Sequence, residues 1–167
     1  MIVETFEQYT ARLLALSAGA DPVEVLASTP ATIARSIHGR SAAALQRSPG
    51  PGRWSAAQIV AHLADAEIVF AYRLRMILAA PGTAIQAYDQ DAWSRVQRAE
   101  SSDAQQSLAL FAAIRESTVR LVRGLGAEEL DRYGIHAERG RESVRHLLAL
   151  YAGHDRNHLA QIERLLT

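Results

Sequence analysis

Two histidines near the end of the sequence, His154 and His158, have the spacing of metal ligands on a helix. Residues four apart lie on the same face of an α-helix, so both imidazoles point in one direction. A third histidine, His62, lies in the apolar stripe of an earlier segment that has helical periodicity. Three neutral imidazoles from two packed helices can hold a divalent ion and leave one coordination position open. We therefore take these three histidines as candidate metal ligands.

The alternative is that these histidines are structural residues of a helical core. The chain contains 6 histidines, and a pair at spacing four arises easily by chance, so the pair alone is weak evidence. Three buried imidazoles without partners would cost on the order of 1–3 kcal/mol each. A shared metal ion would satisfy all three. The residues by themselves leave both interpretations open.

The segment from His154 to His158 also has the histidine spacing of a zincin helix. A zincin places a glutamate directly after the first histidine as its general base. Asp155 occupies that position here, and its shorter side chain suits the role poorly. Peptide hydrolysis by a zincin mechanism is therefore not expected.

Two further polar residues belong to the segment that carries His62. Asp65 follows it by one turn and is a candidate to orient a ligand histidine or to act as a base, with an arginine partner as the alternative. Arg73 lies eleven residues after His62, at nearly the same angular position. A charge on an inward face needs a partner. We expect a carboxylate inside the fold in preference to an anionic group of a substrate or cofactor.

The other histidines and one aromatic segment are less informative. His136 lies in a predicted loop, where it is a candidate for substrate or cofactor contact, but solvent exposure is expected. His38 and His146 are expected at surface or edge positions. The segment 88–93 contains aromatic and acidic side chains that either close over a pocket or form a loop anchored by Trp93.

Composition narrows the class of protein. The 167 residues fit a single domain over 1–167, and 18 acidic against 18 basic residues argue against nucleic acid as a partner. Cysteine is absent, so disulfides, thiolate ligands and a cysteine nucleophile are excluded. The first residues lack the features of a secretory signal, and no stretch approaches the roughly 20 apolar residues that span a bilayer. We expect a cytoplasmic protein that acts on a small molecule, without membrane or nucleic-acid partners.

Helical periodicity dominates the chain, which predicts an all-α protein: a four-helix bundle with short additional helices in the connections. Ser55 and Gln58 form a predicted capping box at the start of one long helix. The segment 135–140 is predicted as a loop. The predicted helices cover about residues 2–18, 21–28, 29–47, 55–79, 102–124 (capped by Ser102) and 141–166, with short helical segments near 89–97 and 128–133.

Several motifs occur in order along nearly the whole chain. The main ones are Trp54-Ser55, His62-Leu63-Ala64-Asp65-Ala66-Glu67 and His154-Asp155-Arg156-Asn157-His158-Leu159-Ala160-Gln161-Ile162. Shorter ones are Asp21-Pro22-Val23-Glu24-Val25-Leu26, Tyr88-Asp89 with Trp93, and His136-Ala137-Glu138-Arg139-Gly140. Together they resemble the DinB-like superfamily, which includes the YfiT-type proteins. Ala137 departs from the proline expected in one branch of that family.

The resemblance implies a four-helix bundle with His62, His154 and His158 as metal ligands, zinc or nickel as the metal, and a homodimer. It also implies one of two activities: transfer of a low-molecular-weight thiol to a small electrophile, or metal-dependent hydrolysis. The competing hypothesis is a non-catalytic, stress-related helical binding module whose histidine cluster is structural.

Overall fold

The computed structural model describes residues 4–167, apart from the side chain of Phe6, and this part of the chain is mainly helical. The α-helices are α1 (Phe6–Ser17), α2 (Pro22–Ile37), α3 (Ala42–Gln46), α4 (Ala56–Ala79), α5 (Gln90–Val96), α6 (Ala104–Arg123), α7 (Ala127–Leu130) and α8 (Val144–Leu166). A 3-10 helix, η1 (Ala99–Ser101), and three short strands, β1 (Ala84–Ile85), β2 (Tyr133–His136) and β3 (Gly140–Ser143), lie between them.

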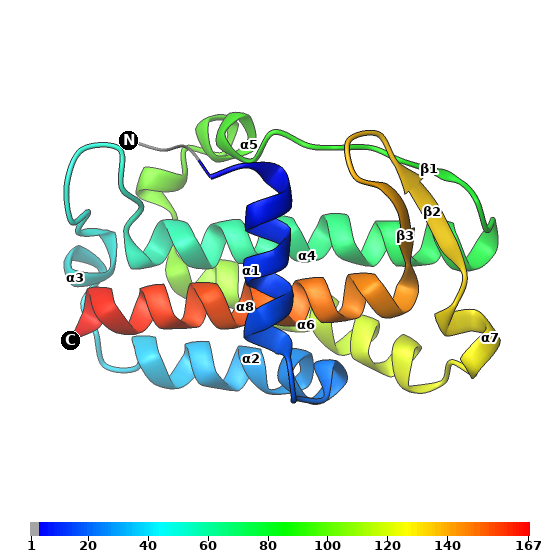
Figure 1. Ribbon diagram of the computed structural model, residues 1–167. Helices are drawn as coiled ribbons and strands as arrows, with labels where there is room; N and C mark the ends of the chain where they lie inside the picture. The colour runs from blue at the N-terminus through cyan, green and yellow to red at the C-terminus, as the bar shows by residue number, and fades with distance from the viewer. Residues whose placement is uncertain (1–3) are drawn as a thin grey trace.

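Four long helices, α2, α4, α6 and α8, form the predicted bundle (Figure 1). Helix α4 packs against α6 and α8, and α2 packs against the same two helices. In Figure 1, α4 and α6 run in one direction, while α2 and α8 run in the other. Consecutive helices are therefore not all antiparallel neighbours, and the connectivity differs from a simple up-and-down bundle.

The long connection between α4 and α6 follows from this arrangement. Because the two helices are parallel neighbours, the chain must return along the length of the bundle before α6 begins. The returning segment contains β1, α5 and η1 and passes along one side of the bundle (Figure 1). The short helix predicted near 89–97 is α5, whose first amides are capped by the Asp89 carboxylate.

A small sheet is the main departure from the all-α prediction. The segment 135–140 is not a loop throughout, because β2 and β3 form an antiparallel hairpin in which only residues 137–139 are the connecting turn. Strand β1 pairs with β2 in parallel. Helix α8 consequently begins at Val144, with Ser143 as its N-cap, and not near residue 141. The strands have four residues or fewer, and they lack the alternating apolar pattern by which strands are recognised.

Helix α2 is continuous, although the sequence predicts separate helices over 21–28 and 29–47. Proline has no N–H, so Pro30 cannot donate to the carbonyl of Leu26, its helical partner. Arg115 on α6 supplies the missing donor, with its Nη1 atom 2.9 Å from this carbonyl oxygen. A tertiary hydrogen bond thus lets the helix pass through the proline.

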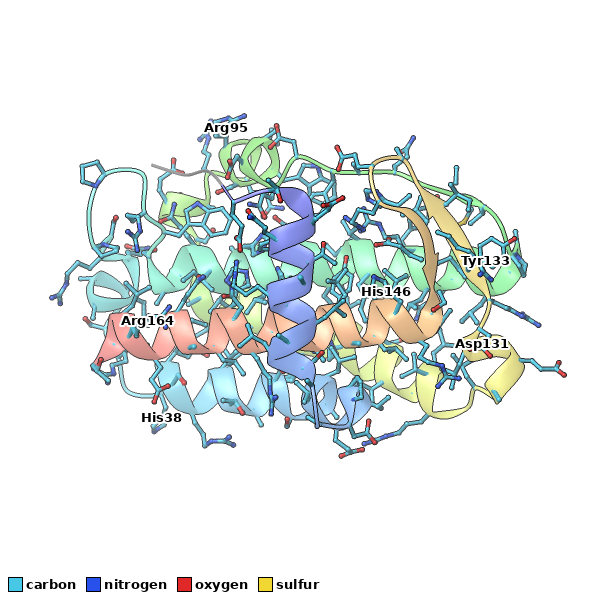
Figure 2. All side chains as sticks on the ribbon, viewed as in Figure 1. His38, Arg95, Asp131, Tyr133, His146 and Arg164 are labelled. Carbon is cyan, nitrogen blue, oxygen red and sulfur yellow. The ribbon has the colours of Figure 1, made fainter. Side chains whose placement is uncertain are left out.

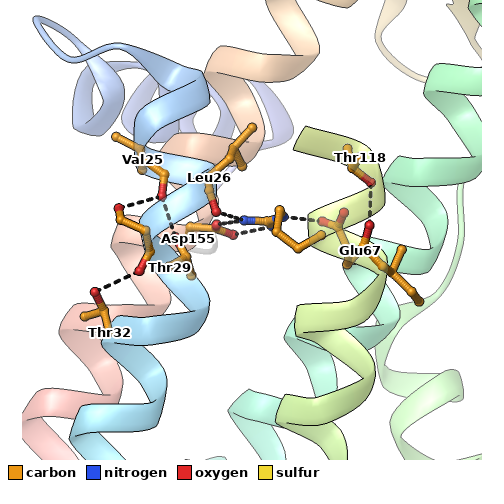
Figure 3. A network of polar contacts seen from close by, with 10 residues as sticks. Val25, Leu26, Thr29, Thr32, Glu67, Thr118 and Asp155 are labelled. Atoms are coloured by element: carbon orange, nitrogen blue, oxygen red, sulfur yellow. Dashed lines mark hydrogen bonds and ion pairs between the residues drawn. The ribbon is translucent and has the colours of Figure 1, made fainter. Parts of the chain in front are cut away.

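Arg115 also binds carboxylates on two other helices of the bundle, α4 and α8 (Figure 3). Its guanidinium donates to Glu67 at 2.8 Å and to Asp155 at 2.5 Å, and all three side chains are buried. A planar guanidinium can serve two carboxylates and a carbonyl at once, which an ammonium group cannot do in this geometry. The network therefore joins α2, α4, α6 and α8 at one point.

The ends of other helices agree with the prediction or shift by a few residues. The capping box of Ser55 and Gln58 is present at the start of α4. Helix α6 is capped by Asp103 and not by Ser102. The predicted start of the first helix, near residue 2, lies outside the described residues, and α1 follows its N-cap Thr5. The helix predicted over 29–47 is interrupted at 38–41, between the end of α2 and the start of α3. Helix α7 is shorter than the predicted segment 128–133.

Helix α1 crosses α8 outside the bundle (Figure 1). The two backbones meet at Gly153, where an added Cβ would lie 1.8 Å from the carbonyl oxygen of Leu13. Only glycine allows this approach. Within residues 4–167, no helix has both the length and the apolar character needed to cross a membrane.

Candidate metal centre

The three candidate ligands meet between α4 and α8. His62 comes from α4, and His154 and His158 come from adjacent turns of α8. Their exposed fractions are 4%, 9% and 6%, so helical periodicity correctly placed all three inside the bundle. The ring centroids are separated by 4.4–5.1 Å.

The nitrogen positions suit a divalent ion. One ring nitrogen from each histidine lies within 4.8 Å of the others, and the Nε2 atoms of His62 and His154 are 3.1 Å apart. Tetrahedral ligands at zinc–nitrogen distances near 2.1 Å are separated by about 3.4 Å. Two neutral Nε2 lone pairs at such a distance repel unless a proton or a cation lies between them. The donor set therefore fits a metal ion of the zinc type.

Gln161 defines which nitrogen of His158 is available. The Nδ1 atom of His158 lies 3.0 Å from Gln161 Oε1. An amide oxygen can only accept, so Nδ1 carries the proton and Nε2 has a free lone pair. This is the arrangement in which an outer partner orients a ligand histidine. Gln161 is not among the residues predicted from the sequence, although its spacing of three from His158 on one helix was a usable signal.

Burial keeps the cluster in the neutral form that binds metals. Burial, and to a lesser extent the neighbouring His158, lowers the pKa of His62 to about 3. Burial also lowers the pKa of His158 to about 4, although Gln161 opposes the change. The pKa of His154 is lowered in the same direction, by burial and then by the other two histidines. At neutral pH all three imidazoles thus offer lone pairs.

Asp65 does not orient a histidine in the structure. Its Oδ1 atom accepts a hydrogen bond from Gln97 Nε2 at 2.5 Å. Burial raises the pKa of this carboxyl, and the bond from Gln97 acts against the rise. The expected partner, an arginine or a ligand histidine, is thus replaced by an amide from the long connection. Its role as a base stays a prediction.

A cavity of about 640 Å³ lies beside the histidine cluster. Its wall is formed by α1, α4, the segment 87–90, the β2–β3 hairpin and α8. His154 is part of the wall, whereas His62 and His158 do not line the cavity. A small molecule in the cavity would therefore approach the cluster from the side of His154.

Arg73 lies on this wall, and the expected pairing with a carboxylate was wrong. It is 5% exposed, and no ion pair joins it to a carboxylate among residues 4–167. Its Nη1 atom is 3.4 Å from the hydroxyl of Tyr151, and its Nη2 atom donates to the carbonyl of Gln86. Its Nε atom is buried without a partner.

His136 is also on the wall, and the expectation of solvent exposure was wrong. It is 1% exposed because it belongs to β2, although the segment 135–140 was predicted as a loop. The expectations for the other two histidines were correct: His38 is exposed and His146 is half-buried (Figure 2). Residues 88–90 line the cavity, so this end of the segment 88–93 closes over it. The Trp93 ring packs against Tyr88 with 5.1 Å between the ring centroids.

The comparisons with known proteins agree with this picture. A relative from Bacillus subtilis, named "Putative metal-dependent hydrolase YfiT", is 28% identical over 86% of this chain and 81% of its own length. A relative from Oceanobacillus iheyensis with the same description is 30% identical over 74% of this chain and 70% of its own length.

A solved structure of YfiT from Bacillus subtilis has a similar fold. It superposes with a TM-score of 0.81 and 25% identity, covering 99% of this chain and 89% of that chain. Its description reads "a probable metal-dependent hydrolase with an unusual four-helix bundle topology". Residues 25–162, which include all three histidines, match the sequence model of the DinB superfamily. The chain therefore belongs to the DinB superfamily.

Proposed function

We propose that this protein is a metal-dependent hydrolase of small molecules, with His62, His154 and His158 as the metal ligands. The observation that carries the proposal is the convergence of three buried, neutral imidazoles on one point beside a cavity. The relatives named as metal-dependent hydrolases support it. The carboxylate closest in sequence, Asp155, is bound to Arg115 and is not available as a fourth ligand.

A divalent ion bound there would act as a Lewis acid and lower the pKa of water or of a thiol at its open position. The chain's own residues would shape the site. Gln161 orients His158, and Trp54 packs on His62 with 4.8 Å between the ring centroids. Asp65, one turn from His62, has its pKa raised by burial, which moves a carboxyl towards the range useful for proton transfer.

The experiment compares the purified protein loaded with zinc, loaded with nickel and treated with EDTA. Ester and amide substrates are offered with and without added low-molecular-weight thiols. We expect hydrolysis that needs the metal, needs no thiol and is lost in His154→Ala. The exposed Arg75, which lies on α4 outside the cavity wall, provides the control Arg75→Met. Metal-dependent conjugation that occurs only with a thiol would replace the hydrolase proposal by the thiol-transferase one.

A structural cluster without catalysis makes a different prediction for stability. If the three histidines only fill the core, His62→Leu should keep or raise the melting temperature, because apolar packing can replace a buried polar cluster. If they hold a metal, the same variant should lose both the ion and the stabilisation that ion binding provides. Thermal unfolding with and without zinc separates the two.

A further inference from the structure

The cavity wall carries a buried positive charge that the fold does not neutralise. Arg115, the other buried arginine in residues 4–167, is bound by two carboxylates. Arg73 has only the Tyr151 hydroxyl and the Gln86 carbonyl as hydrogen-bond partners. A buried charge is normally paired, because removing it from water is costly. The buried charge of Arg73 therefore has no counter-charge among the described residues of the cavity wall.

The neighbouring His136 offers a second donor without an acceptor. Its Nδ1 atom accepts a hydrogen bond from the backbone N–H of Glu138 at 3.1 Å. In the neutral ring Nε2 must then carry the proton. That Nε2 atom is buried and has no partner, as is the Nε atom of Arg73. Buried donors without acceptors are rare in folded proteins and call for an explanation.

A third donor comes from Tyr151 on α8. Its hydroxyl oxygen accepts from Arg73 Nη1, so its proton is free to be donated elsewhere. The ring is held rigidly, stacked on Phe70 with 4.0 Å between centroids. Three side chains from α4, β2 and α8 therefore present donors, and one of them is a cation.

The acidic groups around the cavity do not supply the missing acceptor. Glu4 is held by Arg12 at 2.9 Å. The Asp89 carboxylate accepts from the first amides of α5. Glu138 is exposed to solvent. The other cation of the wall, Arg139, is bound to Glu142 at 2.5 Å. Of the two arginines on the cavity wall, Arg73 is therefore the one without a carboxylate partner among the described residues.

We infer that Arg73, His136 and Tyr151 form a subsite for an anionic oxygen group, a carboxylate or a phosphate, on a small molecule in this cavity. As a substrate subsite the inference rests on the proposed hydrolase function. Small rotations of the Arg73 and His136 side chains would bring their buried donors onto the ligand. Charge-assisted hydrogen bonds from an arginine fork are the strongest that such a group can receive.

The subsite also has a position relative to the metal centre. Tyr151 precedes His154 by three residues on α8, which is about 4.5 Å along the helix axis. The two ring centroids are 6.0 Å apart. A ligand held at Arg73 would therefore extend along α8 towards His154. This geometry selects compact substrates whose anionic group lies a few bonds from the group that reacts.

The test measures binding of three probes of similar shape to the full-length protein by calorimetry. Phenylacetate and phenyl phosphate carry the anionic group, and phenylacetamide is the neutral counterpart. We expect at least one anion to bind about tenfold or more tightly than the amide. The tighter of the two anions identifies the group for which the subsite is built.

Variants test whether Arg73 causes the discrimination, that is, the tighter binding of the anions than of the amide. Arg73→Met should abolish it, Arg73→Lys should keep part of it, and Arg75→Met, an outward-facing control on the same helix, should keep all of it. Equal binding of anions and amide by the wild type would overturn the inference. Full discrimination in Arg73→Met would do the same. Circular dichroism checks folding, and the wild-type comparison decides even if Arg73→Met does not fold.

Repeating the titrations after EDTA treatment separates this subsite from the metal site. An anion that binds only through a metal ion would lose its preference when the ion is removed, and that result contradicts the subsite. If anion binding persists in protein that takes up no zinc or nickel, the proposed function fails and the subsite stands. If metal uptake is normal and the anion preference is absent, the subsite alone fails.

Discussion

The contact between Arg115 and the carbonyl freed by Pro30 can be measured as a coupling energy. In the wild type, Arg115→Met leaves Glu67 and Asp155 buried without their cation, which costs about 3–5 kcal/mol. It also leaves the Leu26 carbonyl without the Arg115 donor, and an unsatisfied buried carbonyl costs about 1–3 kcal/mol. The variant should therefore lose much of its stability.

The second of these costs should disappear when residue 30 has an N–H. In a Pro30→Ala background the helix can satisfy Leu26 by itself. Arg115→Met should then cost less than in the wild type by about 1–3 kcal/mol, the contribution of the carbonyl alone. The carboxylate contribution is the same in both backgrounds and cancels.

Urea unfolding of the four proteins, followed by far-UV circular dichroism, gives this coupling energy directly. Arg115→Lys, which keeps the charge but not the fork, serves if Arg115→Met is too unstable to measure. Additive effects of the two changes, with a coupling below about 0.5 kcal/mol, would refute the idea that Arg115 compensates for Pro30.

Other predictions concern the helix crossing, the orientation of a ligand and acid stability. Gly153→Ala should destabilise the protein by about 1–3 kcal/mol despite the better helix propensity of alanine, since the added Cβ meets the Leu13 backbone. Gly124→Ala, where the nearest atom is 3.5 Å from the added Cβ, should be nearly neutral in the same urea assay. Equal effects of the two changes would show that the close contact between α1 and α8 does not require glycine. Gln161→Ala should weaken zinc binding about 10–100-fold, and unchanged affinity in a chelator competition would show that His158 needs no support. In EDTA-treated protein the pKa of His158 is about 4 in the folded state, below the unfolded value of roughly 6.5. Between these two pH values the unfolded state binds more protons, so stability should fall as pH falls through this window. A His158→Gln variant should show a smaller slope of melting temperature against pH, and an identical slope would count against the lowered pKa.

Much of the site was predictable because it depends on local helical phase. The spacing of His154 and His158, and the phase of His62, follow from 3.6 residues per turn and needed no knowledge of the fold. The capping box at Ser55 is equally local. Such features involve residues within one or two turns of each other, which is the range over which sequence patterns are dependable.

The wrong expectations involved contacts between distant segments. Pro30 does not end α2, because Arg115, far away in the sequence, satisfies the freed carbonyl. His136 is buried because it lies in a short hairpin. The sequence did not predict this hairpin, because its strands have no alternating apolar pattern. Arg73 was expected to pair with a carboxylate, but the fold brings a hydroxyl and a backbone carbonyl to it. In each case tertiary structure overrides the local rule.

The most direct test of the central claim is the metal content of the protein. After equilibrium dialysis against zinc or nickel, elemental analysis should find one ion bound per chain in the wild type and in Arg75→Met. His158→Ala, confirmed as folded by circular dichroism, should bind none with comparable affinity, because two ligands hold such ions far more weakly than three. A wild type that binds neither metal, or a His158→Ala variant that binds as well as the wild type, would contradict the three-histidine site.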